Sequence, residues 1–128
     1  LVYAHDVSAG TKHAVARDVV AGLWERGGGV LSTQVLQEFY VIVTQKLPRP
    51  IDVSMAEKVI GDLLNWEIVV NDGLSILSAI QLQKRYKFSF WDSLIIHAAL
   101  QAGTETLLSE DLSAGQKIRG TTIENPFV

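Results

Sequence analysis

The chain has 128 residues, of which 48% are hydrophobic and 20% are charged, and it contains no cysteine. These values exclude a disordered chain, a disulfide framework and a thiolate zinc site, and the length suits one domain with one sizeable core. The net charge of -3 argues against a general nucleic-acid coat, although an enzyme that gathers carboxylates around a metal ion is also acidic in sequence.

Short strands alternate with longer helices along the chain. In order, the pattern predicts a strand at residues 1–4, a helix at 11–26, a strand at 30–32, helices at 33–46 and 54–65, a strand at 66–70, helices at 74–86 and 92–102, a strand at 105–109, a loop or short helical turn at 110–118 and a strand at 121–127. In the first helix, Val15, Val19 and Leu23 recur at helical spacing, and Gly27 ends it.

This alternation predicts an α/β fold in which helices cover both faces of a mostly parallel central sheet. In such sheets, ligands bind beyond the carboxyl ends of the strands. Ser109, Glu110 and Asp111 directly follow the strand predicted at residues 105–109. These three side chains are therefore the first candidates for a site.

Asp92 lies where the aromatic run of FSFWDSLIIHAA, residues 88–99, gives way to an apolar helix. Ser89 precedes it by three residues, which is the spacing of a capping box, and an acid in the first turn also suits the helix dipole. A metal ligand is the alternative. The local pattern leaves both roles open.

Asp111 and Glu38 have structural alternatives too, since Asp111 could cap the turn after its strand and Glu38 could lie on a solvated helix face. Together with Asp92 they place one acid within a helix, one at a helix start and one at a strand end, which a single crevice could collect. Such oxygen ligands suit Mg²⁺ or Mn²⁺, and the natural chemistry is hydrolysis of a phosphodiester. Spacing alone leaves their convergence open.

Four stretches carry a family resemblance: LVYAHD, STQVLQEFY, FSFWDSLIIHAAL and TLLSEDLSAGQKIRGTTIENPF. In this order they resemble the motifs of a PIN-domain ribonuclease of the VapC-like toxin type, and the likeness runs across the whole chain, residues 1–128. It implies a single PIN-like domain, a three-layer α/β/α sandwich. The implied activity is metal-dependent endoribonuclease cleavage that leaves a 5′-phosphate and a 3′-hydroxyl.

The resemblance also implies a role for particular residues. Glu38, Asp92 and Asp111 would hold Mg²⁺ or Mn²⁺, and Ser109 would support these carboxylates, whereas Glu110 has no clear role. The family's first strand usually begins with an Asp-Thr-Asn-like segment that this sequence does not contain. We expect the missing aspartate upstream of Leu1 in the natural protein, so that the chain lacks the N-terminal part of its first strand.

The partners implied by the resemblance are an RNA substrate, a small antitoxin protein and a second copy in a homodimer. The basic residues Lys84, Arg85 and Lys87 are either a solvated helix end or contacts to an RNA backbone. No apolar run is long enough to span a membrane, and the lack of cysteine suits the cytoplasm.

Two other functions fit parts of the sequence. One is a catalytically incomplete PIN-like module that binds RNA or protein, which the missing aspartate would favour. The other is a receiver-like or phosphatase-like α/β domain in which an acid at a strand end accepts phosphate. A receiver-like domain would need paired acids early in the chain and a lysine later, and this sequence does not have them in that order.

Overall fold

Residue contacts in the computed structural model, which describes residues 1–128, divide the chain into two units. The first unit holds residues 1–29, 35–67 and 127, and the second holds residues 30–34, 68–126 and 128. Each unit has its own hydrophobic core. The two are described in turn.

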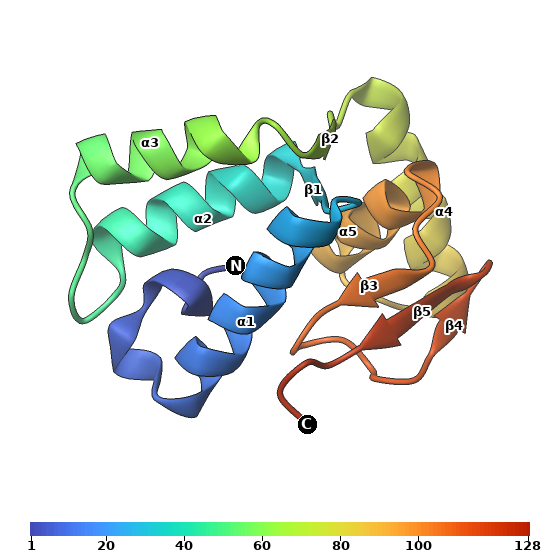
Figure 1. Ribbon diagram of the computed structural model, residues 1–128. Coiled ribbons are helices and arrows are strands. Elements are labelled where there is room, and N and C mark those ends of the chain that lie inside the picture. Colours follow the sequence, from blue (N-terminus) through green and yellow to red (C-terminus); the bar gives the residue numbers. More distant parts are fainter. The chain divides into compact units, whose positions relative to one another are not determined.

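The first unit is helical (Figure 1). Its elements are the 3₁₀ turns η1 (Tyr3–His5) and η2 (Val7–Ala9) and the helices α1 (Thr11–Arg26), α2 (Thr33–Gln45) and α3 (Val53–Leu63), with the first two residues of α2 counted in the second unit. Phe39, Val43 and Ala56 form the buried centre of its core. The predicted helices of this region are confirmed, and Gly27 ends α1 with a left-handed φ of 74°.

The strand predicted at residues 1–4 is wrong. Tyr3–His5 forms a 3₁₀ turn in which the backbone N–H of His5 donates to the Val2 carbonyl at 2.9 Å. Asp6 then accepts from the backbone N–H of Ser8 at 3.0 Å. These local bonds satisfy the backbone groups that a strand could satisfy only beside another strand, and residues 1–4 pair with none.

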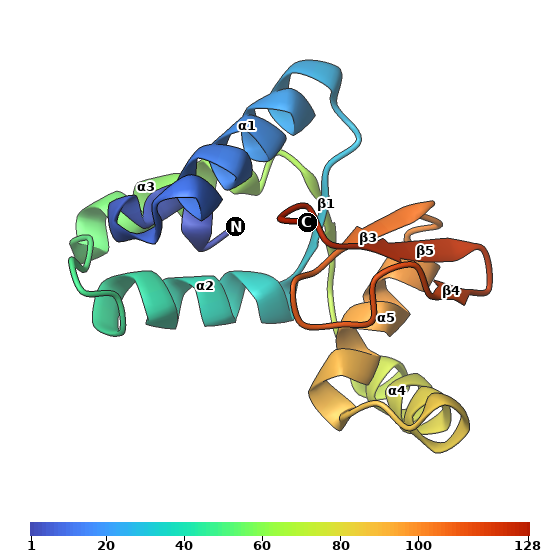
Figure 2. The ribbon, with the colours of Figure 1, turned by 90° about the horizontal axis from the view of Figure 1, so that it is seen from below.

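The second unit combines helices and strands. Its elements are β1 (Val30–Ser32), β2 (Glu67–Val69, of which Glu67 is counted in the first unit), α4 (Gly73–Tyr86), α5 (Phe90–Gln101), β3 (Thr106–Leu108), β4 (Lys117–Ile118) and β5 (Thr121–Glu124). Figure 2 shows α5 between α4 and the strands β3, β5 and β4. Leu82 of α4, Ile96 of α5 and Ile123 of β5 meet in the core of this unit.

The strands form two small sheets, so the predicted mixture of helices and strands is confirmed but the single, mostly parallel sheet is not found. One sheet pairs β1 with β2, and the other has the order β3–β5–β4. In the latter, β3 is parallel to β5, whereas β4 is antiparallel to it. Strand β4 lies at the end of the segment 110–118, which was predicted as a loop or short helical turn.

The turn between β4 and β5 explains the antiparallel pair. Ile118 pairs with Thr121, so only Arg119 and Gly120 connect the strands, with φ values of 48° and 93°. Two consecutive left-handed residues make the tight turn that joins antiparallel strands, and a parallel pair needs a much longer connection. No helix of the chain is both long and apolar enough to cross a membrane.

Candidate functional site

The start of α5 separates the two roles that the sequence allowed for Asp92. Ser89 is the N-cap, and its hydroxyl accepts the backbone N–H of Asp92 at 3.1 Å. The Ser93 hydroxyl donates to the Ser89 carbonyl at 2.8 Å and holds the same turn. Because a serine hydroxyl caps the helix, the half-buried carboxylate of Asp92 is not needed as the cap.

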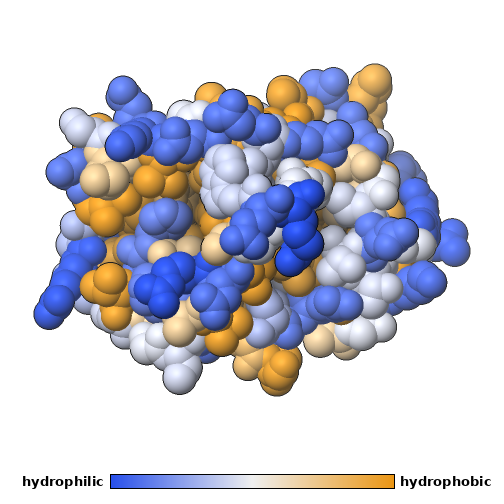
Figure 3. Space-filling model, viewed as in Figure 1, coloured by the Kyte–Doolittle hydropathy of each residue, from blue (hydrophilic) through white to orange (hydrophobic).

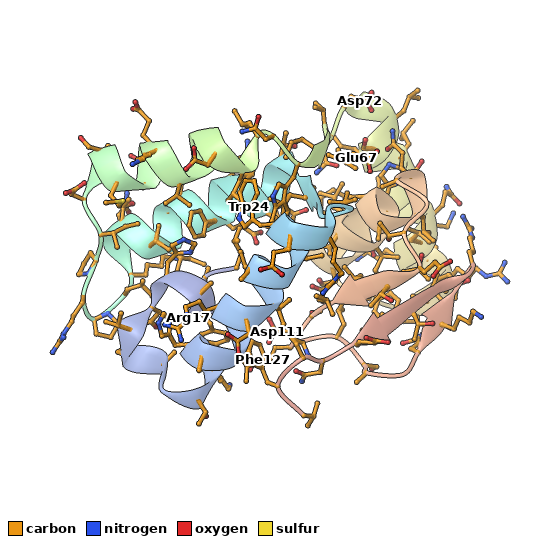
Figure 4. The ribbon with its side chains drawn as sticks, viewed as in Figure 1. Arg17, Trp24, Glu67, Asp72, Asp111 and Phe127 are labelled. Atoms are coloured by element: carbon orange, nitrogen blue, oxygen red, sulfur yellow. The ribbon has the colours of Figure 1, made fainter.

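Ser109 organises the loop after β3 in a similar way. Its backbone N–H donates to the Glu124 carbonyl at 2.9 Å, which extends the pairing of β3 with β5 by one residue. Its hydroxyl accepts the backbone N–H groups of Asp111 at 3.2 Å and Leu112 at 3.3 Å. Leu112 is buried in the core, while Asp111 is exposed and labelled in Figure 4. The carboxylate of Asp111 is therefore not the cap of this turn.

The connection between α5 and β3 brings Asp92 and Asp111 to the same end of the second unit. Thr104 donates from its backbone N–H and its hydroxyl to the Ala99 carbonyl, at 3.1 and 3.0 Å, and Gly103 has a φ of 70°. This tight turn reverses the chain, so α5 and β3 run in opposite directions (Figure 1). The first turn of α5 then lies toward the end of β3, where Ser109 begins the acidic loop.

Gln34 ties the first turn of α5 to the start of α2. Its side chain is only 6% exposed, and its Nε2 donates to the Trp91 carbonyl at 3.3 Å. The residue that it holds is the neighbour of Asp92. Sequence reasoning missed this contact, although a glutamine among apolar residues at the start of a buried helix is a usable signal, since buried amides are normally hydrogen-bonded.

Glu38 lies in α2, in the first unit, and its side chain is exposed. Asp92, Ser109 and Asp111 belong to the second unit, and half-buried Glu110 lies between the last two in sequence. Within either unit, no group of three or more histidine, aspartate or glutamate side chains forms a metal site. The convergence of Glu38 with the two aspartates stays a prediction.

Aromatic and basic residues flank the start of α5 in the sequence, and Trp91 and the basic side chains are exposed. Trp91 is 62% exposed and meets Phe90 edge-on, with ring centroids 5.3 Å apart. Lys84, Arg85 and Lys87 are exposed at the end of α4, and only residues 87–89 separate that helix from α5. The segment from the end of α4 to the first turn of α5 thus carries positive charge, an exposed aromatic ring and Asp92.

The first unit contains a separate pocket of about 410 Å³. It is lined by His5, Val20, Trp24, Val59, Asp62, Leu63 and Asn65. Burial lowers the pKa of His5, and the contact of its Nδ1 with the Leu1 carbonyl at 3.3 Å opposes this only in part. None of the predicted metal-site residues lines this pocket, so it is not the candidate site.

Comparison with known proteins adds no further assignment. No protein-family model matches the chain, and no curated protein matches it.

Proposed function

We propose that the protein is a metal-dependent endoribonuclease whose site is formed by Glu38, Asp92 and Asp111 with Ser109 in support. The observation that carries this proposal is the arrangement at one end of the second unit. There, the hydroxyls of Ser89 and Ser109 take the backbone N–H groups, which leaves both aspartate carboxylates available for a ligand.

Glu38 is the third ligand of this proposal. Residues four apart lie on the same side of a helix, and Gln34 is directed to the first turn of α5. Glu38 lies one turn later in α2, and its side chain is exposed.

The donor set fits a hard divalent cation. Asp92, Asp111 and Glu38 would supply carboxylate oxygens, and Mg²⁺ and Mn²⁺ prefer such ligands together with water and substrate phosphate. When bound, the ion supplies a deprotonated water and neutralises charge on the phosphate. The Ser109 hydroxyl keeps the loop that carries Asp111 in one conformation, and Ser89 does the same for the turn that carries Asp92.

The neighbouring side chains suit a single-stranded RNA substrate. Exposed Trp91 offers a face on which an unpaired base can stack. Exposed Arg85 and Lys87 would contact the phosphate backbone without regard to sequence. Cleavage would leave a 5′-phosphate and a 3′-hydroxyl.

The wider proposal follows the family resemblance of the sequence motifs. It comprises a single PIN-like domain, a role as the toxin of a toxin-antitoxin pair, inhibition by a small antitoxin protein, homodimer formation and a cytoplasmic location. The direct support is the order of the motifs along the chain and the placement of Asp92, Ser109 and Asp111 at one end of one unit.

The test is cleavage of a structured RNA by the protein, produced with any residues that precede Leu1 in its natural reading frame. We expect cleavage in Mg²⁺ or Mn²⁺, none in excess chelator, and a loss of at least a hundredfold in Asp92→Asn. The matched control is Asp62→Asn, which changes an exposed acid of the first unit and should cleave at the wild-type rate.

Two results would contradict the proposal. Cleavage that persists in Asp92→Asn would show that another protein or another site is responsible. RNA binding without cleavage in Mn²⁺ would instead support a non-catalytic PIN-like module.

A further inference from the structure

The pocket of about 410 Å³ in the first unit contains none of the proposed nuclease residues. Its walls come from η1, α1 and α3 and from the residues directly after α3. Val20 and Trp24 stand four residues apart in α1, and Val59 and Leu63 stand four apart in α3, so each pair lies on one side of its helix. The volume lies within the range of about 300–1,000 Å³ that is typical of small-molecule sites.

The apolar wall of the pocket includes an accessible tryptophan ring. Trp24 is 46% exposed, and its ring meets Trp66 edge-on with centroids 5.3 Å apart. Leu63 is buried, and Val20 and Val59 are half-buried. Figure 3 shows hydrophobic atoms among hydrophilic ones at the upper left, where α3 lies in Figure 1. The face of a tryptophan ring attracts other aromatic rings and cations, so this wall suits an apolar or aromatic body next to a positive charge.

The polar residues of the pocket all present hydrogen-bond acceptors. Asp62 contributes a carboxylate, and the Nδ2 of Asn65 donates to the Asp62 carbonyl at 2.9 Å, which leaves the Oδ1 of Asn65 as an acceptor. The Nδ1 of His5 contacts the Leu1 carbonyl at 3.3 Å and must carry the proton in that contact. Burial lowers the pKa of His5, so its ring is mainly neutral at neutral pH and its Nε2 is an acceptor.

The charge of the pocket indicates which ligands it excludes. No lysine or arginine lines it. A ligand with a phosphate or carboxylate would meet the Asp62 carboxylate without a positive partner, which is unfavourable. A protonated amine has positive charge and three donors, which match the carboxylate and the two neutral acceptors.

We propose that this pocket binds a small primary amine with an aromatic or aliphatic body. The ammonium group lies at Asp62 and Asn65, and the body packs against Trp24 and Leu63. This inference goes beyond the proposed nuclease function and does not depend on it, because the pocket and the nuclease residues have no member in common.

Titration of the full protein with 2-phenylethylammonium, followed by two-dimensional amide NMR, tests the proposal. We expect saturable shifts of the amide signals of Trp24, Asp62 and Asn65, with a dissociation constant on the order of 1 mM or below. The neutral 2-phenylethanol and the anionic 3-phenylpropionate carry the same ring without the positive charge. Each should bind at least about threefold more weakly than the amine.

Matched variants distinguish the pocket from general attraction to an acidic protein. Asp62→Asn should weaken binding of the amine by about threefold to fivefold and leave binding of 2-phenylethanol unchanged. Glu57→Gln removes the same charge from an exposed position of α3 that does not line the pocket, and it should bind the amine like the wild type. Trp24→Leu should weaken binding of both the amine and the alcohol, with helical content unchanged by circular dichroism.

Three results would each overturn the proposal. The first is the absence of saturable shifts up to about 10 mM amine. The second is equal affinity for the amine, the alcohol and the carboxylate. The third is an equal loss of amine binding in Asp62→Asn and Glu57→Gln.

Discussion

Ser89 and Asp92 stand three residues apart and have separate tasks at the start of α5. The serine hydroxyl stabilises the helix, while the aspartate occupies a first turn whose direction is fixed by that cap. The sequence predicted a helix start here and could not assign the two tasks, because a capping box and a metal ligand share the same spacing.

The two tasks predict opposite mutant behaviour. Ser89→Ala should lower the free energy of unfolding by about 0.5–2 kcal/mol, as loss of an N-cap does. Asp92→Asn should change it by less than about 1 kcal/mol and abolish cleavage. Urea denaturation together with the RNA assay measures both, and a large stability loss in Asp92→Asn would mean that the carboxylate is mainly structural.

Gln34 is predicted to be a positioning residue. Gln34→Leu removes one donor to the Trp91 carbonyl and should destabilise the protein by about 0.5–1.5 kcal/mol, as the loss of a single hydrogen bond does. Hydrogen exchange at residues 90–93 should become faster and Mn²⁺ affinity should fall. Exposed Gln37→Leu, in the same helix, should leave both unchanged. Unaltered exchange at these residues in Gln34→Leu would rule out the positioning role.

The helices were predicted well because their caps and stops are local. Gly27, Asp52, Asp72 and Ser89 each mark a helix end within a few residues of the chain. The strands depend on partners far away in sequence. Strand β4 was missed since two residues, Lys117 and Ile118, carry no periodicity, and residues 1–4 were assigned as a strand on composition alone.

Two glycines of the first unit should respond in opposite directions to alanine. At Gly29 an added Cβ would lie 2.6 Å from Cε3 of Trp66, whose ring packs edge-on against Trp24. Gly29→Ala should therefore cost roughly 1–3 kcal/mol. Gly61 lies within α3 with nothing within 4 Å, so Gly61→Ala should stabilise by roughly 0.5–1 kcal/mol. The urea midpoints of the two variants measure these changes. Equal changes in Gly29→Ala and Gly61→Ala would contradict the close packing of Gly29 on Trp66.

His5 should make stability depend on pH. Its lowered pKa means that the unfolded chain takes up a proton more readily than the folded one, so stability is fully present above about pH 6.5 and falls as pH is lowered toward the folded pKa. His5→Gln should show less of this loss between pH 7.5 and 5.5. An identical loss in the variant and the wild type would assign the pH dependence to other groups.

At the scale of the whole molecule, the proposed metal ligands come from both units. Asp92, Ser109 and Asp111 share the second unit, whose α5 and β3 bring them to one end, and Glu38 comes from the first. The sequence identified these residues by type and order. The proposed site joins side chains more than 50 residues apart in sequence, such as Glu38 and Asp92, and no local pattern in the sequence encodes their separation in space.

Calorimetric titration of the protein with Mn²⁺ tests the central claim most directly. It measures whether the three carboxylates bind the ion, and it does not require the RNA substrate to be known. We expect saturable binding that Glu38→Gln, Asp92→Asn and Asp111→Asn each weaken at least tenfold, with Asp62→Asn binding like the wild type. Binding that is unchanged in Glu38→Gln would contradict a metal site that includes Glu38.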